Sequence, residues 1–133
     1  MADKEPVWID ERDALAIHGR LIALHGGAPG LRDHRLLESA LARPRQHYAY
    51  ADEPDLIDLA TAYAAGIIRN HPFIDGNKRA GFLLCVLFLE LNSYRFAATE
   101  EDATEAVMGL AAGTLDESAF TAWLRANTQP DPQ

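Results

Sequence analysis

Two apolar stretches separated by a short proline-containing turn constrain the fold of this 133-residue chain most strongly. Residues 56–69 are rich in alanine, and residues 77–92 contain the most apolar run of the sequence. Each stretch is long enough for several helical turns, and Pro72 prevents one helix from running through both. The sequence therefore predicts two long buried helices joined by a turn at residues 72–76.

Four further segments carry apolar residues at helical spacing, and each follows a residue able to cap a helix. They extend to about residues 24, 43, 112 and 126, and their caps are Asp10, Asp33, Thr99 and Asp116, while Asp55 caps residues 56–69. Pro44 is expected to end the second of these helices, leaving residues 46–54 irregular. The prediction is a single domain, residues 1–133, folded as an all-α bundle of about six helices.

The ends of the chain and one internal segment fall outside this helical pattern. Residues 94–98 are predicted to be extended and to pair with residues 7–9, giving a minor short β-hairpin. Residues 1–6 and 127–133 are polar and are predicted to form flexible tails.

The charge balance argues against two classes of partner. The chain has 12 basic and 20 acidic residues, a net charge of −8 at pH 7, and only one short basic cluster, Lys78–Arg79. Binding to nucleic acid or to an anionic membrane surface usually needs a basic face. The longest apolar run, residues 82–91, spans ten residues, whereas a bilayer needs about 20. We therefore expect neither nucleic acid nor membrane as a partner.

Cysteine content and the N-terminus indicate a cytoplasmic location. Cys85 is the only cysteine and lies in an apolar run, where a free thiol behaves as a small hydrophobic side chain. A reducing compartment fits this usage. Residues 1–6 are polar and lead into no apolar segment of the kind found in signal peptides.

Residues 71–79, His-Pro-Phe-Ile-Asp-Gly-Asn-Lys-Arg, connect the two long helices and concentrate groups with chemical uses. The first amides of a helix lack internal partners, and the helix dipole favours anions there. Gly76 allows a close approach of the backbone to a ligand, and Asn77 either caps the helix or donates its amide to an oxygen. Lys78 and Arg79 oppose the dipole, which indicates either a bound anion or two cations that only face solvent.

Two further side chains of this segment suit phosphate chemistry. Asp75 would repel a phosphate unless Mg²⁺ lay between them, although it is equally suited to capping a helix. His71 titrates near neutrality, as a general base must, although a lone histidine is more often structural. Phe73 is expected to point inward and anchor the loop.

The nine residues resemble the signature of the Fic family, His-Pro-Phe-x-Asp/Glu-Gly-Asn-x-Arg, on a loop leading into a helix. The resemblance covers residues from about 10 to 125, and residues 25–33 and 36–43 resemble the N-terminal half of its death-on-curing branch. It implies a compact Fic-type bundle with ATP and Mg²⁺ at one site. The resemblance assigns the base to His71, the metal to Asp75 and the phosphates to Gly76, Asn77, Lys78 and Arg79.

Two positions distinguish the branches of that family. Fic proteins that transfer AMP usually have glycine after the asparagine and a second arginine three residues after the first, where this chain has Lys78 and Phe82. The Asn-Lys-Arg form resembles the death-on-curing branch, which binds the nucleotide reversed and transfers the γ-phosphate. The resemblance therefore implies a protein Ser/Thr kinase. AMP transfer is the alternative, and a non-catalytic binding module is the second.

Inhibition is expected to come from a separate protein. Many Fic proteins carry an inhibitory helix with Ser or Thr four residues before a Glu, and no Glu of this chain has that neighbour. In the death-on-curing branch an antitoxin lays a segment into a groove of the toxin, a common mode of recognition. The resemblance thus implies a growth-inhibiting toxin that acts on a translation factor until an antitoxin neutralises it.

Overall fold

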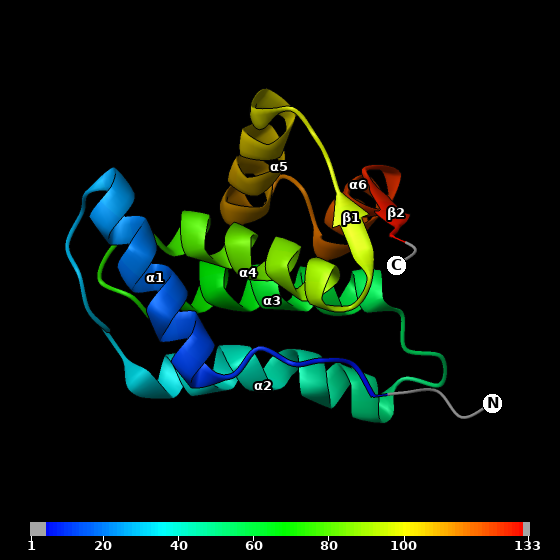
Figure 1. Ribbon diagram of the computed structural model, residues 1–133, viewed down its shortest axis with the longest axis horizontal. Coiled ribbons are helices and arrows are strands. Elements are labelled where there is room, and N and C mark those ends of the chain that lie inside the picture. Colours follow the sequence, from blue (N-terminus) through cyan, green and yellow to red (C-terminus); the bar gives the residue numbers. More distant parts are fainter. Residues whose placement is uncertain (1–4, 132–133) are drawn as a thin grey trace.

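The computed structural model describes residues 5–131, and these residues form six α-helices and two short strands. The helices are α1 (Glu11–His25), α2 (His34–Tyr50), α3 (Leu56–Asn70), α4 (Asn77–Leu91), α5 (Glu100–Ala112) and α6 (Glu117–Ala126), and the strands are β1 (Tyr94–Phe96) and β2 (Thr128–Pro130). Helices α2, α3 and α4 run back and forth through the molecule, with α1 across one end and α5 and α6 on the side away from α2 (Figure 1). The predicted all-α bundle is confirmed.

Helix α3 forms the centre of the bundle. Every residue from 59 to 68 is buried, and α2, α4 and α6 all contact this helix. Small residues allow the close packing, because a Cβ atom on Gly66 would lie 3.2 Å from Ala40 of α2, and one on Gly81 of α4 would lie 3.0 Å from Ile68. The tightly packed pair of α3 and α4 holds both ends of the loop at residues 71–76.

Five of the six helices begin with the side-chain caps that the sequence predicts. The side chains of five residues each accept a hydrogen bond from a backbone N–H in the first helical turn: Asp10, Asp33, Asp55, Thr99 and Asp116. Such caps typically contribute about 1 kcal/mol each. Helix α4 begins at Asn77, as predicted, but its N-cap residue is Gly76 and it has no side-chain cap.

Helix α2 does not end at Pro44, so the predicted boundary there is wrong. It continues to Tyr50, and Pro44 is buried with Leu37 and Leu41 on the face toward α3. A proline inside a helix costs about 3 kcal/mol. Contacts of the following turn offset this cost, since Tyr48 packs edge-on against the Trp8 ring at 5.5 Å and the Arg45 guanidinium lies 5.2 Å above it.

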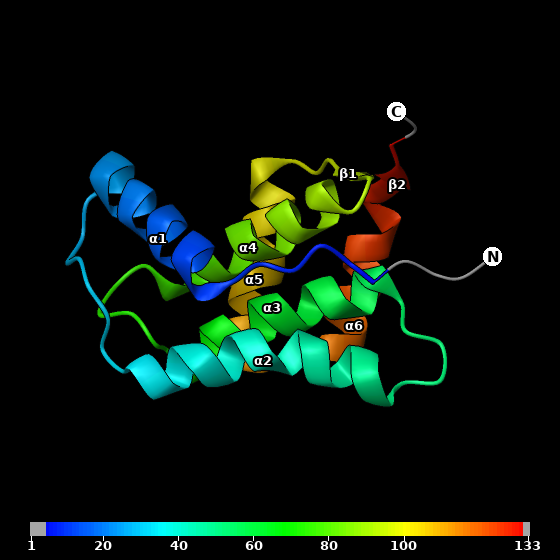
Figure 2. The same cartoon turned by 60° about the horizontal axis from the view of Figure 1, so that its bottom comes forward.

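The predicted partner of the extended segment is also wrong. Strand β1 pairs with β2 in antiparallel register, with Arg95 opposite Gln129. The segment before α1 satisfies its backbone through side chains instead: the Asn92 amide bonds both the N–H and the C=O of Val7, at 2.8 and 3.0 Å. The Tyr63 hydroxyl accepts from the N–H of Ile9 at 2.9 Å. This segment crosses the bundle beside α2 and α4, as Figure 2 shows.

The chain ends contain more regular structure than the sequence indicates. Residues 128–130 form β2, and the N–H of Asp131 donates to the Ser93 carbonyl at 2.8 Å. Residues 1–4 and 132–133 of the two predicted tails lie outside the described residues. Among the helices of residues 5–131, none has the length and apolar character that crossing a bilayer requires.

Candidate active site

The loop between α3 and α4 is anchored at its start by an arginine from the segment before α2. Helix α3 ends at His71, whose φ of 56° is uncommon for a residue other than glycine. The Arg32 guanidinium donates to the carbonyls of Asn70 and His71, at 2.9 and 2.7 Å. A cation at the C-terminus of a helix also complements its dipole. The backbone of His71 is therefore fixed while its side chain remains exposed.

The buried Asn77 side chain forms hydrogen bonds with other residues of the loop. It is 4% exposed, its Oδ1 accepts from the N–H of Phe73 at 2.9 Å, and its Nδ2 donates to the Phe73 carbonyl at 2.9 Å. The same Nδ2 lies 3.1 Å from Nδ1 of His71. An amide nitrogen can only donate, so this contact favours the histidine tautomer with its proton on Nε2. All polar atoms of Asn77 are thus engaged within the loop, and the backbone amides remain for a ligand.

The Asp75 carboxylate lies at the start of α4 between two backbone amides. Its Oδ1 accepts from the N–H of Gly76 at 2.8 Å, and its Oδ2 accepts from the N–H of Ala28 at 3.2 Å. Gly27 makes this second contact possible, because a Cβ there would come within 2.7 Å of Oδ2. The carboxylate therefore does not cap α4, and its exposed side faces the same cavity as the first turn of that helix.

The first turn of α4 combines uncapped amides with two cations. Gly76 adopts a left-handed conformation, with φ of 76°, and supplies no side chain to the amides that follow. Lys78 and Arg79 are exposed, and within residues 5–131 neither forms an ion pair. Two cations beside a positive helix end are electrostatically unfavourable until an anion binds.

A cavity of about 590 Å³ collects these groups. It is lined by fifteen residues: His71, Asp75, Gly76, Asn77, Lys78, Arg79, Phe82, Phe96, Ala98, Thr99, Glu100, Ala103, Thr104, Val107 and Met108. The six motif residues expected to act on the nucleotide all belong to it. Phe73 lies outside it, fully buried beneath the loop. The cavity volume suits a small-molecule ligand.

The far wall of this cavity was not visible in the sequence motif. It consists mainly of β1 and α5 and is largely apolar, and Phe82 of α4 joins it, since its ring meets that of Phe96 edge-on at 5.6 Å. Met108 is half exposed beside them. Apart from Phe82, which the comparison with AMP-transferring Fic proteins singled out, no local sequence signal marks these residues as part of a site, because their role depends on the packing of α5 against α4.

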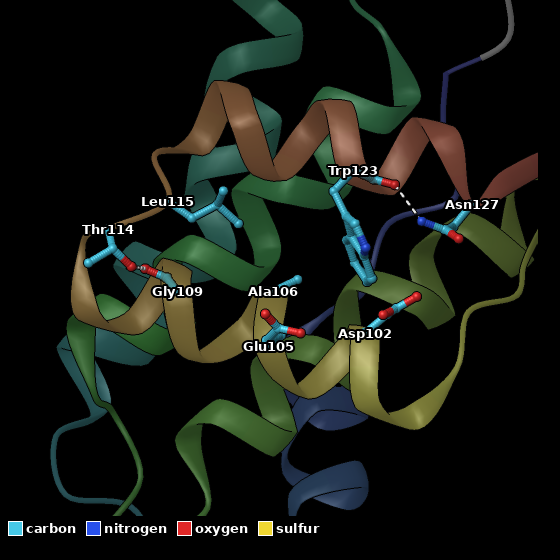
Figure 3. A pocket seen from close by; sticks show the side chains of 8 residues that line it. All are labelled: Asp102, Glu105, Ala106, Gly109, Thr114, Leu115, Trp123 and Asn127. Atoms are coloured by element: carbon cyan, nitrogen blue, oxygen red, sulfur yellow. Dashed lines mark hydrogen bonds between the residues drawn. The ribbon is translucent and has the colours of Figure 1, made fainter.

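A second cavity, of about 490 Å³, lies on the opposite face of α5. It is lined by Asp102, Glu105, Ala106, Gly109, Thr114, Leu115, Trp123 and Asn127. Figure 3 shows the Trp123 indole opposite the carboxylates of Asp102 and Glu105. It contains no motif residue and no cation, so it lacks the positive charge that favours a phosphate.

The donor set of the first cavity fits a divalent cation only together with a ligand. Within residues 5–131, no three His, Cys, Asp or Glu side chains lie close enough to bind a metal ion by themselves. Asp75 supplies one carboxylate, and Mg²⁺ commonly binds through one or two carboxylates plus phosphate oxygens and water. The arrangement therefore suits a cation that arrives with a nucleotide.

An exposed imidazole, a carboxylate and an uncapped helix start thus share one cavity, the arrangement expected of a phosphate-handling enzyme. Comparison with known proteins agrees: residues 8–89 match the model of the Fic/DOC family. The chain is 30% identical over 117 residues to "Protein kinase doc" of Escherichia phage P1, covering 88% of this chain and 92% of that protein. It is 37% identical over 92 residues to "Toxin Doc" of Mycolicibacterium smegmatis, covering 68% of each. The chain belongs to the Fic/DOC family.

Proposed function

We propose that this protein is a death-on-curing-type toxin that transfers the γ-phosphate of ATP to a Ser or Thr hydroxyl of a protein. The observation that carries this proposal is the convergence of His71, Asp75 and the uncapped start of α4 on one cavity. The names of two relatives, a protein kinase and a toxin, support the same activity.

The division of the cavity into a polar and an apolar end supports γ-phosphate transfer. Phosphates fit the end that holds Lys78, Arg79 and the first amides of α4, and a purine fits against the apolar surface of Phe82, Phe96 and Met108. Phe82 lies five residues beyond Asn77, or roughly 7.5 Å along the helix axis at 1.5 Å per residue. A base at that end leaves the terminal phosphate nearest the motif loop and His71.

The reaction follows from the groups at the polar end. The substrate hydroxyl oxygen attacks the γ-phosphorus, the bond from that phosphorus to the β–γ bridging oxygen breaks, and ADP leaves with the electron pair. His71 accepts the hydroxyl proton at Nδ1, the ring nitrogen that carries no proton, so the contact of this nitrogen with the Asn77 amide must open first. Lys78 and Arg79 stabilise the charge on the phosphates. Asp75 would hold Mg²⁺, which would neutralise phosphate charge and help to orient the phosphates.

The proposed biological role includes two protein partners. The target is a translation factor, and an antitoxin neutralises the toxin by laying a segment into a groove on its surface. Cys85 is a free, buried thiol, and a protein whose single cysteine forms no internal disulfide suits the reducing cytoplasm in which such a toxin acts. We infer these roles from family membership and the names of the relatives.

Radiolabelled ATP tests the proposal. The purified protein is incubated with Mg²⁺ and a bacterial translation extract, using ATP labelled on either the γ- or the α-phosphorus, and His71→Ala serves as the control. We expect a protein band labelled only from the γ position and only by the unsubstituted enzyme. Label from the α position alone would establish AMP transfer instead. Growth inhibition that persists in the His71→Ala variant would favour the non-catalytic binding module.

A further inference from the structure

We propose that His18, a buried residue of α1, is a positioning residue that fixes the orientation of the Asp75–Gly76 peptide and so presents the Asp75 carboxylate to Mg²⁺–ATP. This inference rests on the proposed function of the cavity. It adds a residue that is distant in sequence from the motif and lies behind it.

His18 contacts the loop through both a hydrogen bond and its ring face. It is 3% exposed, and its Nε2 lies 2.8 Å from the backbone oxygen of Asp75, so that Nε2 must donate. Its ring stacks on Phe73, with centroids 3.8 Å apart and planes 4° from parallel. A Cβ on Gly76 would lie 3.7 Å from the same Nε2, which places the imidazole directly beneath this glycine.

The hydrogen bond matters because a peptide unit is planar. The Asp75 carbonyl and the Gly76 N–H belong to one plane and point in opposite directions. Since His18 holds the carbonyl on the inner side, the Gly76 N–H points outward, where it donates to Oδ1 of Asp75 at 2.8 Å. Among the described residues, His18 is the hydrogen-bond partner of this carbonyl.

Without His18 the Asp75–Gly76 peptide plane would be free to flip. Glycine tolerates the backbone angles on either side of such a flip at little cost, so Gly76 gives no resistance of its own. A flipped peptide would withdraw the N–H from Asp75 and turn the carbonyl oxygen toward the phosphate end of the cavity. Both changes disfavour a bound anion and its cation, so His18 acts on the site through the backbone and touches no substrate.

Two substitutions separate the two contacts of His18. His18→Phe keeps a ring to stack on Phe73 but removes the donor, and His18→Gln keeps an N–H donor but removes the ring. Thr121→Val is the matched control, because it removes the buried Thr121–Thr61 hydrogen bond at a place remote from the loop. Each variant is measured by calorimetric titration with Mg²⁺–ATP and by thermal unfolding.

We expect His18→Phe to weaken Mg²⁺–ATP binding by about three- to tenfold, the range for one lost hydrogen bond. His18→Gln should stay closer to the unsubstituted protein, and Thr121→Val should lower the unfolding temperature while leaving the affinity unchanged. Equal affinities for His18→Phe and the unsubstituted protein would overturn the proposal, as would an equal loss in Thr121→Val. If His18→Phe does not fold, an affinity of His18→Gln reduced tenfold or more overturns it, and retained affinity supports it.

The ligand-free protein gives a readout that needs no activity. The amide resonance of Gly76 should shift when Asp75→Asn removes the carboxylate. It should also shift, relative to the unsubstituted protein, in folded His18→Phe, where the donor is missing and the carboxylate is still present. A Gly76 resonance unchanged by the loss of the donor would contradict the positioning role. Failure of the proposed function is a separate result, because a protein that binds Mg²⁺–ATP without transferring phosphate still reports on His18 through affinity and through this resonance.

Discussion

The two cavities share helix α5 as a wall but differ in the groups that face it. The first contains the start of α4, the imidazole of His71, and the cations Lys78 and Arg79, which form no ion pair with any other residue between 5 and 131. The one acidic residue of α5 that lines this cavity is Glu100. The second contains Asp102 and Glu105 opposite Trp123 and has no cation. Their volumes, about 590 and 490 Å³, are similar.

From this difference we infer that a phosphate would be bound through the start of α4 and its side chains, and that the volume of a cavity does not decide the matter. Five helices of residues 5–131 satisfy their first amides with an Asp or Thr cap, and α4 does not. The predictions below alter the groups in which the two cavities differ, in order of decreasing expected effect.

Removal of the imidazole should have the largest effect. His71→Ala is expected to lower the rate of phosphate transfer by about 10²- to 10⁴-fold, the usual contribution of a general base. Because the side chain is exposed, thermal unfolding should change little. Single-turnover kinetics with saturating ATP measures the rate, and a variant that keeps most of the activity would exclude His71 as the base.

Neutralisation of the carboxylate beside α4 should affect binding of the metal–nucleotide complex. Asp75→Asn is expected to weaken Mg²⁺–ATP binding by at least about tenfold, or ~1.4 kcal/mol. The exposed position of Asp75 predicts a smaller change in the free energy of unfolding. Thermal melts of the unsubstituted protein and of Asp75→Asn, each with and without Mg²⁺–ATP, separate the effect on binding from the effect on folding. Equal stabilisation of the two proteins by Mg²⁺–ATP would contradict this role of Asp75.

Removal of the Glu100 carboxylate from the first cavity should increase ATP affinity slightly, whereas Asp75→Asn should decrease it. Glu100→Gln is expected to strengthen ATP binding by about twofold, because an exposed like charge contributes only a fraction of a kcal/mol. The gain should shrink as salt is added. Weaker Mg²⁺–ATP binding in this variant would instead indicate that Glu100 helps to hold the cation.

Substitutions in the second cavity should not change the affinity for the nucleotide. The double substitution Asp102→Asn and Glu105→Gln removes two charges of the same kind from the other face of α5. We expect no change in ATP affinity by calorimetry. A change comparable to that of Glu100→Gln would show that the negative charge of α5 acts on both cavities as a whole.

The helices could be predicted from the sequence because their signals are local. An Asp or Thr cap followed by apolar residues at helical spacing fixes a helix start within a few residues, as Asp55 and Thr99 do. The errors arose where distant contacts decide. The aromatic contacts of Trp8 carry α2 past Pro44, and the Asn92 side chain takes the place of a strand partner for Val7.

The motif could likewise be read from the sequence, but its surroundings could not. Residues 71–79 are contiguous, so their chemistry is visible before any fold is known. Arg32, His18 and the α5 wall reach the site from other elements, and nothing in their own neighbourhoods marks them. The role expected of the Asn77 side chain shows the same limit, because only the fold reveals that its polar atoms are bonded to Phe73 and His71.

The most direct test is to add Mg²⁺–ATP to the isotopically labelled protein and follow its amide resonances. The account predicts that the amides of Lys78 and Arg79 shift first and most strongly, together with residues of the Phe82 and Phe96 wall. The resonances of the Trp123 indole N–H and of the Asp102 and Glu105 amides should not shift. Shifts centred on Trp123, with Lys78 and Arg79 unchanged, would contradict the account.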